Sequence, residues 1–293
     1  MADFEPPLEV VAADVLRALR EDLGAGDCTA ELISADTRLE TLVISREPAV
    51  LCGGPWFEET FRQLDEAVSV HWQAHDGDRI HKDQEICRLS GPARPILSGE
   101  RTALNFLQTL SGTATQARHY VDAVAGTGAT ILDTRKTLPG LRLAQKYAVR
   151  CGGARNHRVG LFDAILIKEN HIAAAGSITG AVRQASRLYP ELLLEVEVES
   201  AEQLEEALQA GAQRVLLDNF SIRDLAATVE RYRGRIELEA SGGIDLQTVR
   251  AVAETGVDFI STGDLTKSVR ATDFSMRFMT AKAAIRGGSK RAS

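Results

Sequence analysis

The stretch from Leu192 to Thr262 decides the fold, and it reads LLLEVEVESAEQLEEALQAGAQRVLLDNFSIRDLAATVERYRGRIELEASGGIDLQTVRAVAETGVDFIST. Short apolar runs of strand length alternate in it with longer segments whose apolar residues recur at helical spacing. The predicted strands cover residues 192–198, 214–218, 236–241 and 258–262. The predicted helices cover residues 201–210, 222–232 and 246–255. Repeated strand–helix units of this kind predict a parallel sheet with helices outside it.

Two more strand-like runs precede this stretch, at residues 130–133 and 164–168, and bring the predicted sheet to six strands. A complete eightfold barrel takes roughly 250 residues, far more than these six units occupy. We therefore expect an incomplete or compact α/β barrel over residues 115–267, preceded by a long helix at 98–124.

The first 114 residues follow a different pattern, with a helix predicted at 8–20 and short strands at 41–44, 68–72 and 86–89. Turn sequences separate these pieces, so residues 1–114 are predicted to form a mixed α+β domain. After the last strand the chain leaves the barrel pattern. Residues 268–293 are expected to pack back on the first domain, with a helix at Phe274–Ile285.

The charge balance narrows the class of ligand. The chain has 293 residues and a net charge of −7, which argues against a general nucleic-acid binder. Cations are nevertheless concentrated between residues 131 and 170, where eight of them (Arg135, Lys136, Arg142, Lys146, Arg150, Arg155, Arg158, Lys168) stand against three acids (Asp133, Asp163, Glu169). A cationic island in an acidic protein attracts small anions while long polyanions are repelled.

Cysteine usage and the N-terminus bear on the compartment. Cys28, Cys52, Cys87 and Cys151 form no CxxC pair, and a chain of this length needs no disulfide framework, so reduced thiols are expected. The N-terminal residues lack the basic and apolar regions of a signal peptide. No apolar run approaches a membrane span. These features predict a soluble, cytoplasmic protein.

Polar residues follow the predicted barrel strands at their C-terminal ends. They are Asp133-Thr134-Arg135-Lys136, Lys168, Glu197, Asp218, Ser241-Gly242-Gly243 and Thr262-Gly263. In barrel enzymes the reacting groups occupy this end, because the loops there meet over one cavity. The series therefore predicts a site at the mouth of the barrel.

Acids alternate with Val and Leu in residues 193–199 and 236–241. If the apolar side packs on the helices, the acids point into the barrel, where they need a cationic partner. For Glu195, Glu237 and Glu239 a salt-bridged lining without chemistry is the favoured interpretation.

Two further features suggest anion binding. The glycines of Ser241-Gly242-Gly243 and Thr262-Gly263 follow the last two strands, where barrel enzymes often bind phosphate. Arg101 is predicted in the first turn of a helix, where the dipole disfavours a cation unless an anion lies nearby. A solvated arginine on an exposed turn explains Arg101 equally well.

The segment ILDTRKTLPGLRLAQKYAVRCGGARNHRVGLFDAILIKENHI, from Ile131 to Ile172, resembles the quinolinate phosphoribosyltransferase (nicotinate-nucleotide pyrophosphorylase, carboxylating) family. The resemblance extends through EDLGAGDCT, LSGERTALNFLQTLSGTAT, LLLEVEV, VLLDNF, LEASGGI and ISTGDLT. It implies an N-terminal α/β sandwich, an open barrel and a homodimer or higher oligomer. It also implies a Mg²⁺-dependent reaction of quinolinate with phosphoribosyl pyrophosphate that yields nicotinate mononucleotide, pyrophosphate and CO₂.

The resemblance also implies three groups of site residues. The dicarboxylate pocket would be lined by Arg135, Arg158, Lys168 and His157, with Arg101 reaching in from the neighbouring subunit. The catalytic group would be Lys136, Glu197 and Asp218, the two acids also being the metal ligands. The donor's 5′-phosphate would be held by Ser241, Gly242, Gly243 and Gly263, with Thr134 and Thr262 beside them.

One departure and three alternatives stay open. Lys267 stands where the family usually has His, which keeps the cation but loses its acid–base range. A related transferase could act on nicotinate or another ring acid. A Schiff-base lyase would use Lys168, at the end of an apolar strand, as its nucleophile. A catalytically inactive anion-binding protein is the third alternative, and intact Lys136, Glu197 and Asp218 argue against it.

Overall fold

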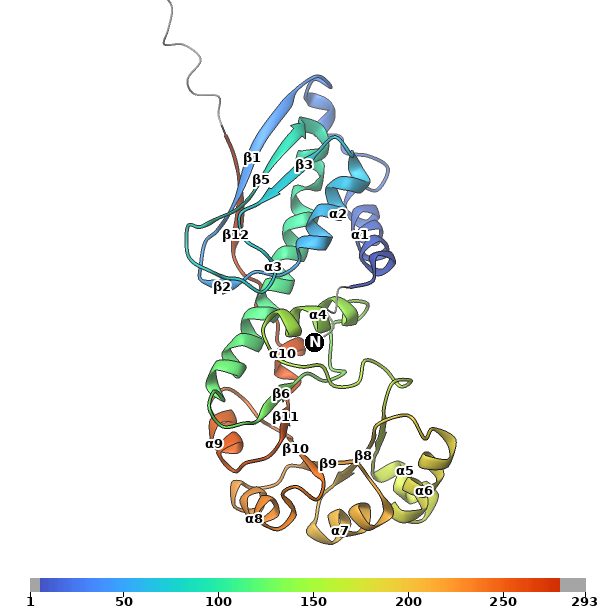
Figure 1. Cartoon of the computed structure of the whole chain (residues 1–293). Coiled ribbons are helices and arrows are strands. Elements are labelled where there is room, and N and C mark those ends of the chain that lie inside the picture. Colours follow the sequence, from blue (N-terminus) through green and yellow to red (C-terminus); the bar gives the residue numbers. More distant parts are fainter. Residues whose placement is uncertain (1–5, 280–293) are drawn as a thin grey trace, which may run out of the picture.

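The computed structural model describes residues 6–279 and divides them into two layered parts (Figure 1). The upper part in Figure 1 contains α1 (Leu8–Leu23), η1 (Ala30–Leu32), β1 (Arg38–Ser45), β2 (Ala49–Val50), α2 (Gly54–Leu64), β3 (Ser69–Trp72), β4 (Arg79–Ile80), β5 (Glu85–Pro92) and β12 (Phe274–Phe278). The long helix α3 (Ala93–Ala123) runs from this part into the lower one. It therefore crosses the domain boundary predicted at residue 114.

The N-terminal domain is built on a four-stranded antiparallel sheet in the order β12-β1-β5-β3. Helices α2 and α3 cover one face of it, because Phe57 and Phe61 of α2 and Leu104 of α3 share a core with the strands. Strands β2 and β4 pair separately. This arrangement confirms the predicted mixture of sheet and helices.

The return of the C-terminal segment to the first domain is confirmed, but the helix expected at Phe274–Ile285 is wrong for its first part. Residues Phe274–Phe278 form β12, which pairs with β1 over the whole strand. Phe274 and Met276 are buried and the residue between them is less so, a period of two that suits a strand. Residues 280–293, the rest of the segment predicted to pack back, lie outside the described part of the chain.

The lower part is the parallel barrel. Its elements are β6 (Thr130–Leu132), α4 (Arg142–Cys151), β7 (Ile165–Ile167), α5 (Glu169–Ala175), α6 (Ile178–Leu188), β8 (Leu194–Val198), α7 (Ala201–Ala210), β9 (Arg214–Asp218), α8 (Ile222–Tyr232), β10 (Glu237–Ser241), α9 (Val249–Glu254), β11 (Phe259–Ser261) and α10 (Asp264–Lys267). The strand order is β6-β11-β10-β9-β8-β7, and the two edge strands are not paired, so the barrel is open. The six predicted strands and the incomplete barrel are confirmed.

The apolar faces of these strands pack on the outer helices, as the alternation predicted. Val196, Val198, Leu238 and Ala240 are all buried in one core with residues of the surrounding helices. At the open edge of β6, Arg155 forms an isolated parallel β-bridge with Leu132. The segment after α4 is thereby drawn alongside the first strand, at the gap in the barrel.

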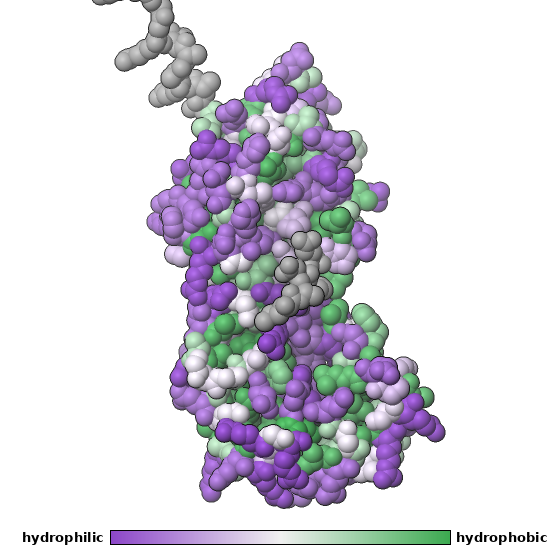
Figure 2. Space-filling model, in the orientation of Figure 1, coloured by the Kyte–Doolittle hydropathy of each residue, from purple (hydrophilic) through white to green (hydrophobic). Residues whose placement is uncertain are grey.

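The surface shown in Figure 2 is mostly hydrophilic, with apolar residues scattered among the polar ones. Within residues 6–279 no helix is both long and apolar enough to cross a membrane. All four cysteines are free, which agrees with the expected reduced thiols.

Candidate active site

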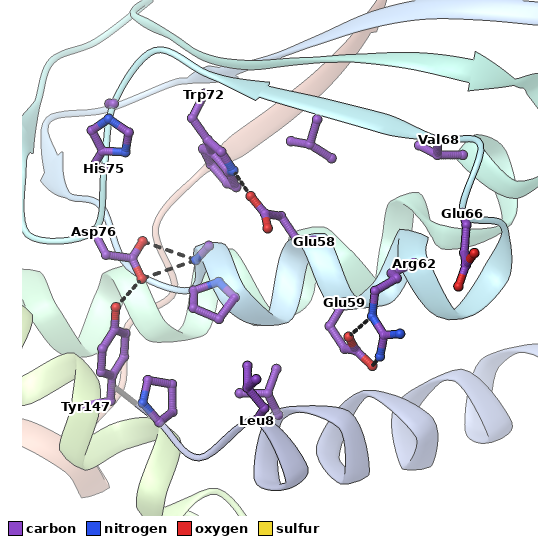
Figure 3. A pocket seen from close by; sticks show the side chains of 16 residues that line it. Leu8, Glu58, Glu59, Arg62, Glu66, Val68, Trp72, His75, Asp76 and Tyr147 are labelled. Carbon is purple, nitrogen blue, oxygen red and sulfur yellow. Dashed lines mark hydrogen bonds and ion pairs between the residues drawn. The ribbon is translucent and has the colours of Figure 1, made fainter. Parts of the chain in front are cut away.

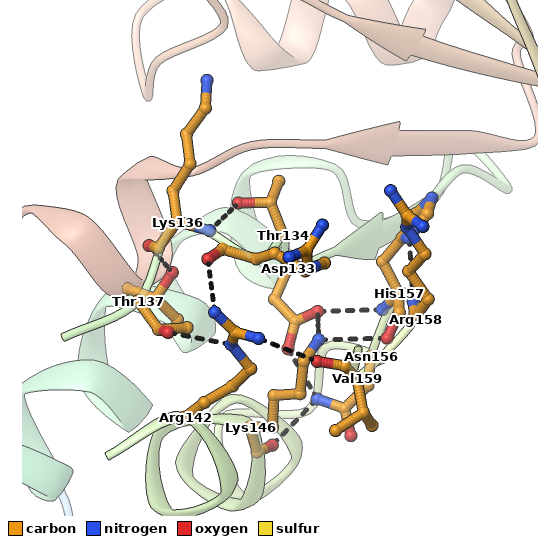
Figure 4. Close-up of polar contacts among 12 residues, drawn as sticks. Asp133, Thr134, Lys136, Thr137, Arg142, Lys146, Asn156, His157, Arg158 and Val159 are labelled. Atoms are coloured by element: carbon orange, nitrogen blue, oxygen red, sulfur yellow. Dashed lines mark hydrogen bonds and ion pairs between the residues drawn. The ribbon is translucent and has the colours of Figure 1, made fainter. Parts of the chain in front are cut away.

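A buried ion pair anchors the loop that follows β6 (Figure 4). The Nζ atom of Lys146, on α4, lies 2.5 Å from Oδ1 of Asp133, and both side chains are fully buried. Lys146 also donates to the carbonyl of His157, while Asp133 accepts from the backbone N–H of His157 and the amide of Asn156. These bonds tie the end of β6, helix α4 and residues 156–157 into one unit.

Burial acts on both partners of this pair. It raises the pKa of the Asp133 carboxyl and lowers the pKa of the Lys146 ammonium, and the charge of each partner opposes the shift of the other. Sequence reasoning assigned no role to Lys146. Its place on α4 beside the buried Ala148 and Val149 is the signal that could have revealed a buried lysine.

Arg135, on the loop after β6, lies close to Arg158, on the segment between α4 and β7. Burial lowers the pKa of Arg158, and the neighbouring positive charge of Arg135 lowers it further. The buried Nε of Arg135 has no hydrogen-bond partner among the described residues. An anion bound between the two guanidinium groups would offset their mutual repulsion and accept a hydrogen bond from the unused Nε–H of Arg135. The structure thus brings the two predicted arginines close together.

The charged residues at the neighbouring strand ends form a second group. Lys168, just after β7, makes an ion pair with Glu197 of β8. The pKa of Asp218, at the end of β9, is raised by burial and then by the charge of Glu197, and is lowered by Lys168 and Lys136. Four predicted residues from separate elements therefore face one another.

The glycine loops lie beside this second group. Gly242 has φ +100°, and a Cβ there would collide with the side chain of Asn219. Gly243 has φ +62° with open space around it. A Cβ on Gly263 would lie 2.9 Å from Cδ of Lys136, so the Lys136 side chain lies against the last glycine loop. Backbone can thus approach a ligand closely at these loops.

The hydroxyl residues of the site are held by backbone contacts. Thr134 Oγ1 accepts from the backbone N–H of Lys136 at 3.1 Å, and Thr262 Oγ1 donates to the carbonyl of Ile244 at 2.9 Å. The carbonyl of Ser241, which ends β10, accepts from the N–H of Asn219 at 3.0 Å. These contacts fix the loops around the mouth.

Deeper in the barrel, the imidazole of His157 meets two buried carboxylates. Its Nε2 is 2.9 Å from Glu195 Oε2 and 3.5 Å from Glu239 Oε2. Burial is the main reason that the pKa of Glu195 rises to about 7 and that of Glu239 to about 8. Burial also lowers the pKa of His157. The ring is therefore neutral near neutral pH.

The expected salt-bridged lining is present here. Arg214 Nη2 lies 2.8 Å from Glu237 Oε2, and Arg214 Nη1 lies 3.7 Å from Glu239 Oε2. Glu237, the first residue of β10, is about half exposed, at 49%, and lies at the end of the barrel opposite the mouth, whereas Glu239 is fully buried.

The dipole argument for Arg101 is wrong. Helix α3 begins at Ala93, so Arg101 lies in its third turn, beyond the reach of the first-turn dipole. Arg101 is exposed in the N-terminal domain and makes no hydrogen bond or ion pair within residues 6–279. Lys267, the last residue of α10, is also exposed.

A cavity of about 1060 Å³ lies elsewhere, between α1, α2 and β3 (Figure 3). Its polar groups already satisfy one another, as Trp72 does with Glu58 and Tyr147 with Asp76. A cavity of about 370 Å³ lies between α7 and α8 and reaches Asp218 at the end of β9. At the barrel mouth Arg135 lies close to Arg158, and its buried Nε has no hydrogen-bond partner among residues 6–279. We therefore favour the mouth over the larger cavity as the functional site.

Comparison with known proteins agrees with this geometry. Family models for the N-terminal and C-terminal domains of quinolinate phosphoribosyl transferase match residues 27–111 and 113–277. A probable nicotinate-nucleotide pyrophosphorylase [carboxylating] of Bacillus subtilis is 44% identical, over 87% of this chain and 89% of its own. The Mycobacterium leprae nicotinate-nucleotide pyrophosphorylase [carboxylating] is 43% identical, over 89% and 95%.

A solved structure gives the same result. The nicotinate-nucleotide pyrophosphorylase from Francisella tularensis superposes with a TM-score of 0.92 and 45% identity, over 94% of this chain and 98% of its own. Both halves of the chain and the whole fold are thus matched, and the chain belongs to the quinolinate phosphoribosyl transferase family.

Proposed function

We propose that this protein transfers the phosphoribosyl group of phosphoribosyl pyrophosphate to quinolinate, with loss of CO₂, to give nicotinate mononucleotide and pyrophosphate for NAD biosynthesis. The observation that carries the proposal is the Arg135–Arg158 pair, two clustered cations beside the carboxylates and glycine loops of the barrel mouth. Two guanidinium groups suit the two carboxylates of the ring, each of which can be gripped in a bidentate manner.

The reaction requires positioning and charge stabilisation rather than a protein nucleophile. The pyridine nitrogen forms a bond to C1′ of the ribose as the bond to pyrophosphate breaks, through a cation-like sugar. Arg135, Arg158 and Lys168 would hold the ring acid, while Lys136 would face the pyrophosphate from its place against Gly263. Loss of CO₂ then leaves the bonding electron pair on the ring carbon, where the adjacent positively charged nitrogen stabilises it until that carbon takes a proton from water.

The donor side fits a magnesium ion. Glu197 and Asp218 are close enough for the charge of one to raise the pKa of the other. Oxygen ligands from one or two carboxylates, completed by substrate phosphates, are what Mg²⁺ favours. When bound, the ion would neutralise the charge of the pyrophosphate leaving group.

The site is proposed to be shared between two copies of the chain, in a homodimer or higher oligomer in the cytoplasm. Arg101 is exposed and unpaired within the described residues, as a residue that completes a partner's pocket would be. Leu161 and Phe162, on the loop after Arg158, are 72% and 75% exposed. Exposed apolar side chains beside a site commonly mark a surface that another chain covers.

The two enzyme alternatives differ in what they require. A transferase for nicotinate would need cations for one carboxylate only, and the paired arginines favour a dicarboxylate. A Schiff-base lyase needs a neutral lysine, whereas Lys168 is engaged as a cation by Glu197. Borohydride with a carbonyl substrate should leave no stable adduct on Lys168.

Isothermal titration of quinolinate and nicotinate into the wild type and Arg158→Met tests the proposal. The wild type should bind quinolinate at least tenfold more tightly than nicotinate, since a charge-assisted bond contributes about 1.5–3 kcal/mol. Arg158→Met should remove most of that preference. Equal affinity for the two acids in the wild type would favour the nicotinate alternative.

A further inference from the structure

The imidazole of His157 has both of its ring nitrogens engaged inside the protein. Nδ1 lies 2.8 Å from the backbone nitrogen of Arg158, and Nε2 lies 2.9 Å from Glu195 Oε2. A backbone N–H can only donate, so Nδ1 must present its lone pair to Arg158. The single proton of the neutral ring is therefore on Nε2, which donates it to Glu195.

This tautomer limits what His157 can do. His157, Glu195 and Glu239 offer ligand atoms within 4.8 Å of one another, an arrangement that could suggest a metal site. A nitrogen that carries the ring proton has no lone pair for a metal, so the cluster is unsuited to one. Neither nitrogen is left to receive a hydrogen bond from, or donate one to, a substrate carboxylate. The ring instead supports the backbone of the next residue.

We propose that Glu195 is a positioning residue for the ring-acid pocket. By accepting the Nε2 proton it fixes the tautomer in which Nδ1 receives the Arg158 N–H, and so orients Arg158 toward the dicarboxylate. The inference rests on the proposed function, because it names quinolinate as the ligand that Arg158 grips.

The placement of Glu195 on β8 supports this role. Glu195 is 1% exposed and precedes Glu197 by two residues, so both lie on the same face of the strand. The deeper acid contacts His157 and the outer acid contacts Lys168. One strand thereby serves both the ring-acid side and the donor side of the mouth.

The other charged groups around the ring do not replace Glu195. Glu239 on β10 is farther from Nε2, at 3.5 Å against 2.9 Å, and it lies close enough to Glu195 for the charge of that carboxylate to raise the pKa of Glu239. Arg214 on β9 approaches Glu239 at 3.7 Å. Glu195 is thus the acceptor in contact with the ring, with Glu239 behind it.

The test compares Glu195→Gln, whose amide oxygen still accepts from Nε2–H, with Glu195→Leu, which has similar size and no acceptor. Glu237→Gln is the matched control, since it makes the same chemical change at a half-exposed position at the end of the barrel opposite the mouth. Nitrogen-15 NMR of histidine-labelled, ligand-free protein reports which ring nitrogen of His157 carries the proton. Steady-state kinetics give KM for each substrate and kcat.

In the wild type, Glu195→Gln and Glu237→Gln, the His157 proton should be on Nε2. In Glu195→Leu both tautomers of His157 should be populated. The KM for quinolinate should rise about tenfold or more, because Arg158 would lose one oriented charge-assisted bond to the substrate carboxylate. The KM for phosphoribosyl pyrophosphate should stay within about twofold of the wild-type value. Should Glu195→Leu fail to fold, Glu195→Asp withdraws the acceptor by one methylene and should raise the same KM.

A wild-type ring that carries its proton on Nδ1, or on both nitrogens, would overturn the inference. So would a folded Glu195→Leu with an unchanged KM for quinolinate. The tautomer is read in the ligand-free protein and does not depend on turnover. Failure of the proposed function would appear separately, as no turnover of quinolinate by the wild type and the control alike.

Discussion

Replacing Lys146 by Met should be among the most destabilising single changes in the barrel. The ammonium lies 2.5 Å from Asp133 with both side chains fully buried, and it also bonds the carbonyl of His157. Removing one partner of a buried pair leaves an uncompensated charge and costs about 3–5 kcal/mol. Asp133 would keep two neutral donors, the His157 N–H and the Asn156 amide, which places the loss within that range rather than above it.

Urea denaturation followed by circular dichroism measures this loss as a change in the free energy of unfolding. Arg79→Met is the control, because its pair with Asp122 is exposed on both sides and such a surface pair contributes only about 0.2–1 kcal/mol. Adding Asp133→Asn to Lys146→Met removes the stranded charge but keeps an oxygen for the His157 N–H. The double variant should regain at least half of the loss. A loss below about 1 kcal/mol for Lys146→Met, or a double variant less stable than the single one, would refute the reasoning.

The site itself supports three other predictions. Burial is the main reason that the pKa of Glu239 rises from 4.5 to about 8. The protonated Glu239 side chain therefore contributes its full stabilisation below pH 4.5, and this stabilisation is lost as the pH rises to about 8. The free energy of unfolding of the wild type, relative to Glu239→Gln, should therefore fall across this range, and parallel pH profiles for the two proteins would contradict this. Gly242→Ala should raise KM for phosphoribosyl pyrophosphate at least tenfold, because the added Cβ collides with Asn219. Gly243→Ala has open space around its Cβ and should lower the free energy of unfolding by only about 1 kcal/mol. Equal KM values for the two variants would contradict this prediction. Arg101→Ala chains mixed with Lys136→Ala chains should partly regain activity if the site is shared, and no recovery after demonstrated subunit exchange would remove Arg101 from it.

Local pattern is enough to predict the barrel. Each strand is an apolar run with a polar end, and the strand-end rule alone brings Lys168, Glu197 and Asp218 together. The rule works because parallel strands all end at the same edge of the sheet. It needs no knowledge of which strands are neighbours.

Long-range contacts cannot be predicted in the same way. Strand β12 pairs with β1, more than 200 residues earlier in the chain, and nothing local in residues 274–278 reveals that partner. The predicted start of α3 is too late because Pro95 lies in its first turn, where a missing N–H costs the helix no hydrogen bond. Burial of Lys146 and the tautomer of His157 likewise depend on partners supplied by other elements.

Release of labelled CO₂ from quinolinate reports the proposed phosphoribosyl transfer with decarboxylation. Purified full-length protein is incubated with phosphoribosyl pyrophosphate, Mg²⁺ and quinolinate labelled at the 2-carboxylate, and the released CO₂ and nicotinate mononucleotide are measured together. We expect equal amounts of the two products, and none without the phosphoribosyl donor. Turnover of nicotinate with no CO₂ from quinolinate would contradict the proposed function.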